Sequence, residues 1–139
     1  EWIQSAIAAG ATLHCGGTRN GRVIEPAILT DMPETEHAWC EEAFAPLIVL
    51  RRFSDFEEAI NGANDTPFGL AAGVFTSNMQ RAMVAMKRLR FGTVQINETS
   101  SARADVMPFG GIKESGFGKE GPSYAAEEMS IERLIVLNP

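Results

Sequence analysis

The chain has 139 residues, of which 45% are hydrophobic and 22% are charged, and its formal net charge is −6. That length and apolar content predict one ordinary domain with a hydrophobic core. The acidic balance excludes a nucleic acid or an anionic membrane as the expected partner, because binding to phosphates depends on clustered cations.

The first third of the chain predicts one helix and two strands. Apolar residues at helical spacing predict a helix over residues 2–9, and the helix ends at Gly10. The segment "ATLHC" predicts a short strand, and "VIEPAIL" predicts a second one. Pro26 makes the second strand an edge or irregular strand, because proline donates no ladder hydrogen bond. Residues 30–42 predict a loop with one helical turn.

The middle of the chain predicts strands and helices in alternation. "PLIVLRRF" predicts a strand, and Ser54 with Glu57 predicts a capping box that begins a helix. "LAAGVF" predicts the next strand. Ser77 with Gln80 predicts a second capping box, for an apolar-striped helix that ends at Gly92. "TVQIN" predicts a further strand.

A long loop separates these elements from the end of the chain. Residues 98–121 predict this loop, which is followed by a short helix around residues 124–129 and a last strand, "RLIVLN". Parallel neighbours in a sheet need crossover connections, and such connections are usually helices. The alternation therefore predicts an α/β fold: a mostly parallel sheet with helices on both faces.

Within the long loop, Gly116, Gly118 and Gly121 have the spacing G-x-G-x-x-G. A dinucleotide-binding turn needs a strand before these glycines and an acidic residue about twenty residues further on. Here a loop precedes the glycines and the chain has nearly ended. A phosphate-binding loop is also not supported, because Lys119 is not followed by Ser or Thr. We interpret the glycines as residues that give the loop its shape.

Several segments together carry a resemblance to a known family. "EEAFAPLIVL", "NDTPFGLAAGVFT", "GTVQIN" and "MPFGGIKESGFGKEG" occur in this order, with "GATLHCGG" and "EPAIL" upstream. In these segments the chain resembles the C-terminal part of the catalytic domain of the aldehyde dehydrogenase superfamily, over nearly all of residues 1–139. The resemblance implies a fold like that catalytic domain, incomplete in this chain.

The resemblance also implies an enzyme that oxidises an aldehyde to a carboxylic acid with NAD or NADP. In that family a cysteine thiolate attacks the aldehyde, hydride passes to nicotinamide, and a glutamate-activated water releases the acid. The nucleophile, the general base and most of the cofactor site lie upstream of the matched region. We therefore expect a piece of a longer protein, with no catalytic residue in this chain and no activity of its own.

The two cysteines and two histidines predict neither a nucleophile nor a metal site. Cys15 ends a predicted strand, and Cys40 stands beside two carboxylates, which disfavour a thiolate. Neither lies in the family's nucleophile motif. Two distant cysteines make neither a disulfide scaffold nor a thiolate metal cluster, and His14 and His37 lack partners at ligand spacing. We expect hydrogen-bonded or solvated histidines and a reducing, cytoplasmic location.

By the same resemblance, Glu42 and Phe44 are cofactor-binding residues. They match the family's Glu-x-Phe pair, whose carboxylate holds the hydroxyls of the nicotinamide ribose while the aromatic ring packs beside the nicotinamide. The alternative for Glu42 is a solvated acidic loop, which is our interpretation of Glu41. Ala45 departs from the glycine common in this motif, and its β-carbon restricts the backbone that aims Glu42.

The resemblance implies substrate contacts from the loop Asn97 to Met107, with Asn97 and Arg103 among them, and from Phe109 as a wall of the pocket. The loop is unusually polar for a tunnel that takes long aliphatic aldehydes. Arg103 offers forked donors to a carboxylate, phosphate or phosphonate. The hypothesis is a small polar or anionic aldehyde, and the loop also resembles the branch that handles phosphonoacetaldehyde, lactaldehyde or glyceraldehyde phosphate. The alternative is that Arg103 pairs with Asp105 or Glu98 on the surface.

The last predicted strand, near residues 132–138, is apolar and has no partner after it. In the family this region pairs across subunits, which implies a homo-oligomer, a dimer or a tetramer. No apolar run is long enough to span a membrane, and no leader opens the chain. The competing hypothesis is a stand-alone structural or interaction module without chemistry. A cysteine nucleophile motif in the upstream gene sequence would separate the two hypotheses.

Overall fold

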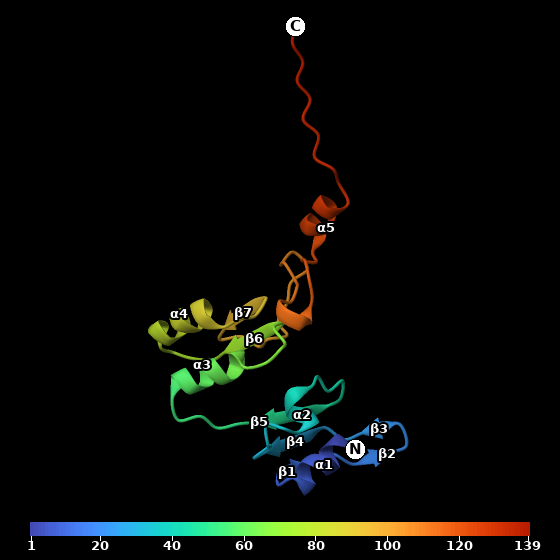
Figure 1. The fold of residues 1–139 in the computed structure, drawn as a ribbon, viewed down its shortest axis with the longest axis vertical. Helices are drawn as coiled ribbons and strands as arrows, with labels where there is room; N and C mark the ends of the chain where they lie inside the picture. The colour runs from blue at the N-terminus through green and yellow to red at the C-terminus, as the bar shows by residue number, and fades with distance from the viewer. The chain divides into compact units, whose positions relative to one another are not determined.

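A computed structural model describes residues 1–139, and Figure 1 labels their helices and strands. The chain forms two compact units, Glu1–Ser54 and Asp55–Pro139. None of the helices is both long enough and apolar enough to cross a membrane. The interpretation of residues 1–139 as one part of a catalytic domain stays a prediction.

The first unit is built on a three-stranded sheet in the order β1-β4-β5. Its two helices pack against one face of the sheet, where Ala6 and Leu29 have no exposed surface. The helix predicted over residues 2–9 is α1, and the two strands predicted after it contain β1 and β4. The helical turn predicted within residues 30–42 is α2, and it is followed by β5. The bounds are α1 (Trp2–Ala8), β1 (Thr12–Cys15), β4 (Ala27–Thr30), α2 (His37–Cys40) and β5 (Leu47–Leu50).

The segment "VIEPAIL" forms two strands rather than one. β3 (Val23–Ile24) pairs with β2 (Arg19–Asn20) in an antiparallel hairpin, and β4 begins only after Pro26. Proline has no N–H to donate to a ladder, so the interruption falls where the sequence predicts an irregular strand. The N–H of Ala27 then donates to the carbonyl of Pro46 (2.9 Å), which starts the pairing of β4 with β5.

The second unit contains the strand–helix–strand crossover that the sequence predicts. β6 (Ala71–Val74) and β7 (Thr93–Ile96) pair in parallel, and α4 (Met79–Arg88) connects them after α3 (Phe56–Asn64). Ile60, Ala85 and Leu89 form the buried core of this unit. One face of the strand pair packs against that core, through Ala72, Val74, Val94 and Ile96.

The first turns of both helices differ from the predicted capping boxes. The N-cap of α3 is Asp55, one residue after Ser54. The box predicted at Ser77 is wrong, because the N-cap of α4 is Asn78, whose side-chain oxygen accepts a hydrogen bond from the N–H of Arg81. Asparagine and serine are about equally good N-caps, so the motif alone did not separate two adjacent candidates.

The apolar stripe of α4 is narrower than the sequence predicts. Ala82 and Ala85 are buried, but Met83 and Met86 are 44% and 46% exposed. The helix therefore approaches its neighbours closely through small residues, and the methionines lie at the margin of the contact. This small-residue contact lets α4 lie close over the strand pair.

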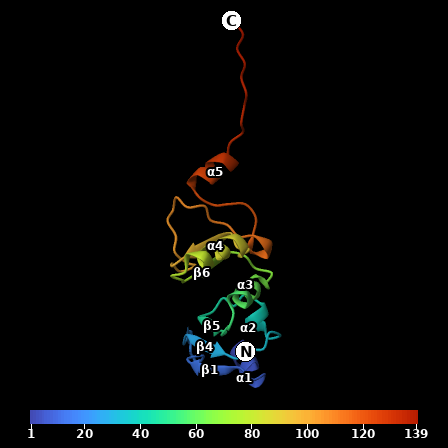
Figure 2. The ribbon, with the colours of Figure 1, turned by 90° about the vertical axis from the view of Figure 1, so that its left-hand side faces the viewer.

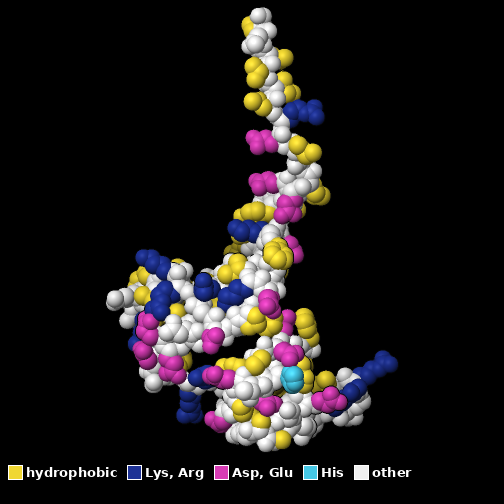
Figure 3. All heavy atoms as spheres, in the orientation of Figure 1, with side chains coloured by type: hydrophobic (Ala, Val, Ile, Leu, Met, Phe, Trp, Pro, Cys, Tyr) yellow, Lys and Arg dark blue, Asp and Glu magenta, His cyan; other side chains and the backbone are white.

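Few regular elements follow β7. The loop contains one short turn of 3₁₀ helix, η1 (Lys113–Ser115), and a single bridge between Phe109 and Glu120, before α5 (Pro122–Glu128). Residues 131–139 form no helix or strand within this chain (Figure 2). The space-filling view shows apolar side chains along this segment (Figure 3). The predicted strand near residues 132–138 has no partner within the chain, so its pairing across subunits stays a prediction.

The predicted α/β fold class is confirmed by the structure. β4 and β5 are parallel, as are β6 and β7, and a helix lies in each connection. Two antiparallel pairs were not predicted, namely β1 with β4 and β2 with β3. The connection from β1 to β4 contains the β2–β3 hairpin and no helix, so the chain reverses direction instead of crossing over.

Candidate functional site

Glu42 and Phe44 lie together in the short loop between α2 and β5. Two tight turns shape this loop, with the N–H of Ala45 donating to the carbonyl of Ala43 and the N–H of Leu47 donating to Ala45 (2.8 Å each). Phe44 is 94% exposed. The carboxylate of Glu42 takes part in none of the ion pairs of the chain. Both residues line a hollow of about 480 Å³ in the first unit.

This pair has the donors, acceptors and ring surface that a nicotinamide riboside requires. A carboxylate without an internal partner can accept hydrogen bonds from two neighbouring hydroxyls, and an exposed ring can pack beside another ring. Ala45 is not among the residues with positive φ. The loop therefore does not use the conformational freedom of the glycine that is common in the family at this position.

Arg103 and Phe109 come together in the loop after β7. The Cζ atom of Arg103 lies 4.4 Å from the centroid of the Phe109 ring, which is a cation–π contact. The carboxylate of Glu98 instead accepts a hydrogen bond from the N–H of Thr99 (2.8 Å). Neither Glu98 nor Asp105 pairs with Arg103. The surface ion pair that was the alternative is not formed in the structure.

A cavity of about 490 Å³ opens beside Arg103 and Phe109. Strands β6 and β7 supply one wall, and the loop supplies the other. Arg103 is the one charged residue in the lining, and its guanidinium attracts anionic groups. The remaining lining residues are Leu70, Ala71, Thr93, Gln95, Ser100, Ser101, Ala102, Met107, Pro108 and Phe109.

Asn97 occupies a different position from the other two predicted substrate contacts. Its φ is +59°, in the left-handed region that asparagine tolerates better than most residues. Its side-chain oxygen accepts a hydrogen bond from the N–H of Thr76 (2.8 Å), and its own N–H donates to the carbonyl of Val74 (2.7 Å). Asn97 therefore joins the ends of β6 and β7 and does not line the cavity. Its contact with substrate stays a prediction.

The three glycines of the G-x-G-x-x-G spacing follow a 3₁₀ turn, not a strand. Gly116, Gly118 and Gly121 have φ values of +141°, +70° and +133°, in the region that favours glycine. The helix after them has only seven residues. Both observations agree with the interpretation that these glycines give the loop its shape.

Cys40 and both histidines make ordinary polar contacts. Cys15 and Cys40 are exposed free thiols, and the thiol of Cys40 donates to the carbonyl of Glu34 (2.8 Å). His37 lies 2.6 Å from the carboxylate of Glu41, through Nδ1. Nothing in these contacts resembles the arrangement of an activated nucleophile and a base.

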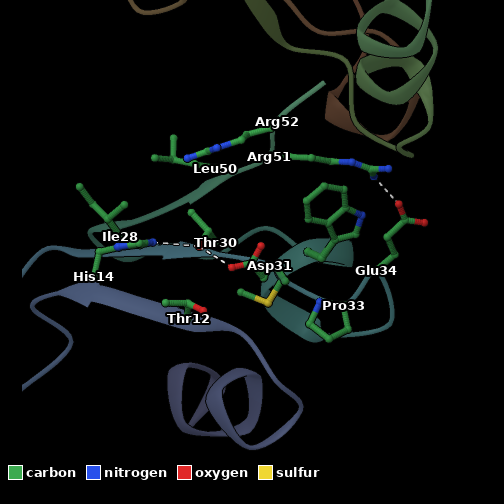
Figure 4. A pocket seen from close by; sticks show the side chains of 12 residues that line it. Thr12, His14, Ile28, Thr30, Asp31, Pro33, Glu34, Leu50, Arg51 and Arg52 are labelled. Carbon is green, nitrogen blue, oxygen red and sulfur yellow. Dashed lines mark hydrogen bonds and ion pairs between the residues drawn. The ribbon is translucent and has the colours of Figure 1, made fainter. Parts of the chain in front are cut away.

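A second hollow of the first unit, of about 870 Å³, lies over the face of the sheet that the helices leave open (Figure 4). Thr30 Oγ1 donates to the carboxylate of Asp31 (2.8 Å) and lies 2.9 Å from Nε2 of His14. Arg51 pairs with Glu34 at the other end. These polar groups are engaged with one another, so the hollow shows a hydrogen-bonded histidine rather than a site prepared for a ligand.

Two polar residues that line the cavity beside Arg103 were not predicted from the sequence: Thr93 and Gln95. A signal for Gln95 was present. In "TVQIN" the residues alternate, so Thr93 and Gln95 share the face opposite Val94 and Ile96. A polar side chain in an otherwise apolar strand marks the face that does not pack against the core. Ser100 and Ser101 also line the cavity and lie within residues 97–107, where the family resemblance implies substrate contacts.

Comparisons with known proteins assign the chain to a family. The Aldehyde dehydrogenase family model matches residues 1–135. The 3-sulfolactaldehyde dehydrogenase of Priestia aryabhattai is 42% identical over 138 residues, which are 99% of this chain and 29% of that protein. The chain thus spans less than a third of the length of this relative.

Two solved structures show the same similarity in three dimensions. Aldehyde dehydrogenase 21 from Physcomitrella patens, in complex with the reaction product succinate, matches with a TM-score of 0.90 and 39% identity, over 92% of this chain and 27% of that chain. Glyceraldehyde-3-phosphate dehydrogenase GapN from Methanocaldococcus jannaschii, complexed with NADP, matches with a TM-score of 0.85 and 40% identity, over 92% of this chain and 28% of that chain.

Proposed function

We propose that this chain, which belongs to the aldehyde dehydrogenase family, is the latter part of an NAD(P)-dependent enzyme that oxidises a small anionic aldehyde to a carboxylic acid. One observation carries the substrate class: the cavity beside β6 and β7 has Arg103 as its one charged residue. Three similar proteins have an acidic compound in their names or bound to them, namely sulfolactaldehyde, succinate and glyceraldehyde 3-phosphate. The nucleophile and general base belong to the part of the enzyme outside this chain.

The chain's contribution to cofactor binding is the pair Glu42 and Phe44. When bound, NAD or NADP accepts a hydride from the substrate. The carboxylate of Glu42 would accept hydrogen bonds from the ribose hydroxyls, and the exposed ring of Phe44 would pack beside the nicotinamide. The proposal is supported by the exposure of Phe44 and by the lack of an internal ion pair at Glu42.

Arg103 binds the acidic group of the aldehyde at the end remote from the reacting carbon. A guanidinium donates two parallel hydrogen bonds to a carboxylate, phosphate or sulfonate, which sets direction as well as affinity. The ring of Phe109 lies against the guanidinium and limits its movement. Fixing the remote end of a short substrate also fixes its aldehyde carbon relative to the rest of the enzyme.

The test is the ratio of kcat/KM for succinic semialdehyde to kcat/KM for butanal, which has the same number of carbons and no charge. We expect Arg103→Ala in the full-length enzyme to lower this ratio by about 10- to 100-fold, the value of a charge-assisted hydrogen-bond pair. Arg103→Lys keeps the positive charge but loses the two parallel guanidinium donors, so its ratio should be intermediate.

Arg81→Ala is the matched control, because Arg81 also lies over a ring, that of Phe56 (5.7 Å), but is outside the cavity. An Arg103→Ala enzyme with an unchanged ratio would rule out the anionic substrate class. If the full-length protein forms no NAD(P)H with either aldehyde, the competing hypothesis of a structural or interaction module is favoured instead.

A further inference from the structure

Gly73 and Gln95 lie opposite each other in the parallel pair of β6 and β7. Their neighbours along both strands pack against the core under α3 and α4. Successive side chains of a strand point to opposite faces, so positions 73 and 95 belong to the other face. That face forms the wall of the cavity beside Arg103, and Gln95 lines it.

Gly73 leaves room for the loop to lie directly on this face. A β-carbon at position 73 would come within 2.8 Å of the carbonyl oxygen of Glu98 and 3.0 Å of the nitrogen of Ser100. Both contacts involve backbone atoms, which cannot turn aside as a flexible side chain can. Any larger residue at position 73 would therefore push the start of the loop away from the sheet.

Gln95 holds the loop a few residues further on. Its side-chain N–H donates to the carbonyl of Ala102 (2.5 Å), and the N–H of Ala102 donates to the carbonyl of Thr99 (3.1 Å). Both backbone polar groups of Ala102 are thus engaged. Gln95 is only partly exposed, so this hydrogen bond is shielded from competing water. Arg103 is the next residue along the chain.

We propose that Gln95 is a positioning residue for Arg103. Its amide fixes the carbonyl of Ala102, so that the side chain of Arg103 leaves the loop toward Phe109 and the cavity. Gly73 supplies the space in which the loop reaches Gln95. This inference rests on the proposed function and extends it, because it assigns selectivity for an anionic aldehyde partly to a neutral strand residue that need not touch the substrate.

Gln95→Met tests the inference in the full-length enzyme, because methionine keeps the length of the side chain and removes its donor. We expect faster hydrogen–deuterium exchange in residues 98–107. We also expect the ratio of kcat/KM for succinic semialdehyde to that for butanal to fall about 3- to 10-fold, the value of one neutral hydrogen bond, mainly through KM for the anion. Gln80→Met on the exposed surface of α4 is the matched control.

Two further variants test whether Gln95 acts through Arg103 and cover the case in which Gln95→Met does not fold. In an Arg103→Ala background, Gln95→Met should change the ratio by less than about twofold, because a residue that acts through Arg103 has nothing left to position. Gly73→Ala should displace the same loop and lower the ratio in the same direction, which covers the case that Gln95→Met does not fold.

The inference is overturned if exchange in residues 98–107 is unchanged in Gln95→Met, or if the losses from Gln95→Met and Arg103→Ala are additive. It also fails, with the proposed function intact, if Arg103→Ala lowers the ratio and Gln95→Met does not. If Arg103→Ala itself leaves the ratio of the two kcat/KM values unchanged, the anionic substrate class fails. This holds whatever hydrogen exchange shows about the hydrogen bond from Gln95 to the carbonyl of Ala102.

Discussion

Glu42 and Arg103 share one property at the scale of single residues: each carries a full charge in a hollow and forms no ion pair within the chain. Other charged residues of the chain are paired, such as Arg88 with Glu57 and Arg51 with Glu34. A charge left without an internal partner beside a concave surface is available to a ligand. Together with the family motif around Glu42 and the position of Arg103 beside Phe109, this makes the two residues candidates for contacts with the cofactor and the substrate.

Glu42→Gln should raise KM for NAD(P) in the full-length enzyme by about tenfold, because a neutral amide accepts hydroxyl hydrogen bonds more weakly than a carboxylate. Initial rates at saturating aldehyde measure this KM. Glu41→Gln is the adjacent control, since the carboxylate of Glu41 is engaged with His37 (2.6 Å), and it should change KM by less than about twofold. Equal effects of the two substitutions would contradict the assignment of Glu42.

At the scale of elements, Arg88 joins α4 to α3. Nη1 of Arg88 contacts both carboxylate oxygens of Glu57 (2.6 and 2.5 Å), and Asn64 binds the carbonyl of Arg88 and the N–H of Arg90 (2.8 Å each). Lys87 and Arg88 stand in the last turn of α4, where basic residues compensate the helix dipole. In the structure Arg88 has a specific role, because its ion pair with Glu57 and the bonds from the side chain of Asn64 to backbone groups at the end of α4 hold α3 and α4 together.

The cap of α4 gives a prediction at the same scale. Asn78→Ala should make the amide protons of the first turn of α4 exchange about fivefold faster, because losing an N-cap costs about 1 kcal/mol. Native-state hydrogen exchange measures this local opening. Ser77→Ala should change it by less than about twofold, since Asn78 and not Ser77 accepts from the N–H of Arg81. The reverse order of the two effects would restore the capping box predicted from the sequence.

At the scale of the whole molecule, the end of the chain exposes apolar surface that nothing in the chain covers. Ile131, Leu134, Ile135, Val136 and Leu137 are all mostly exposed. A contiguous apolar segment of this kind marks an interaction surface, and an unpaired strand-forming segment pairs readily with another strand. The predicted homo-oligomer would cover it in this way.

Ile135→Asp should therefore reduce the oligomer of the full-length protein to smaller species, because a carboxylate buried in a strand pairing carries a large desolvation cost. Sedimentation velocity measures the change in mass. Asn138→Asp introduces the same charge at the polar end of the segment and should leave the mass unchanged. An Ile135→Asp protein that retains the mass of the unmodified protein would show that this segment does not hold subunits together.

Most helices and strands followed from periodicity in the sequence, because the signal is local. "PLIVLRRF", "LAAGVF" and "TVQIN" each contain a strand, and the apolar residues of α3 and α4 have helical spacing. The antiparallel pairing of β1 with β4 was not predictable in the same way. It depends on a hairpin that folds the chain back, and no pattern within either strand records which neighbour it will have.

In the candidate site, too, local sequence signals were predictable and contacts between distant segments were not. The sequence by itself determined the family, the α/β class and the residue types at Glu42, Phe44, Arg103 and Phe109, because these depend on motifs read along the chain. Only the tertiary structure decided that Arg103 lies against Phe109 rather than beside Asp105 or Glu98. It also decided that the loop after β7 packs against Gly73 and is hydrogen-bonded to Gln95. Those contacts join side chains and backbone groups from different segments, and their distances are set by how the loop packs on the strands rather than by any spacing in the sequence.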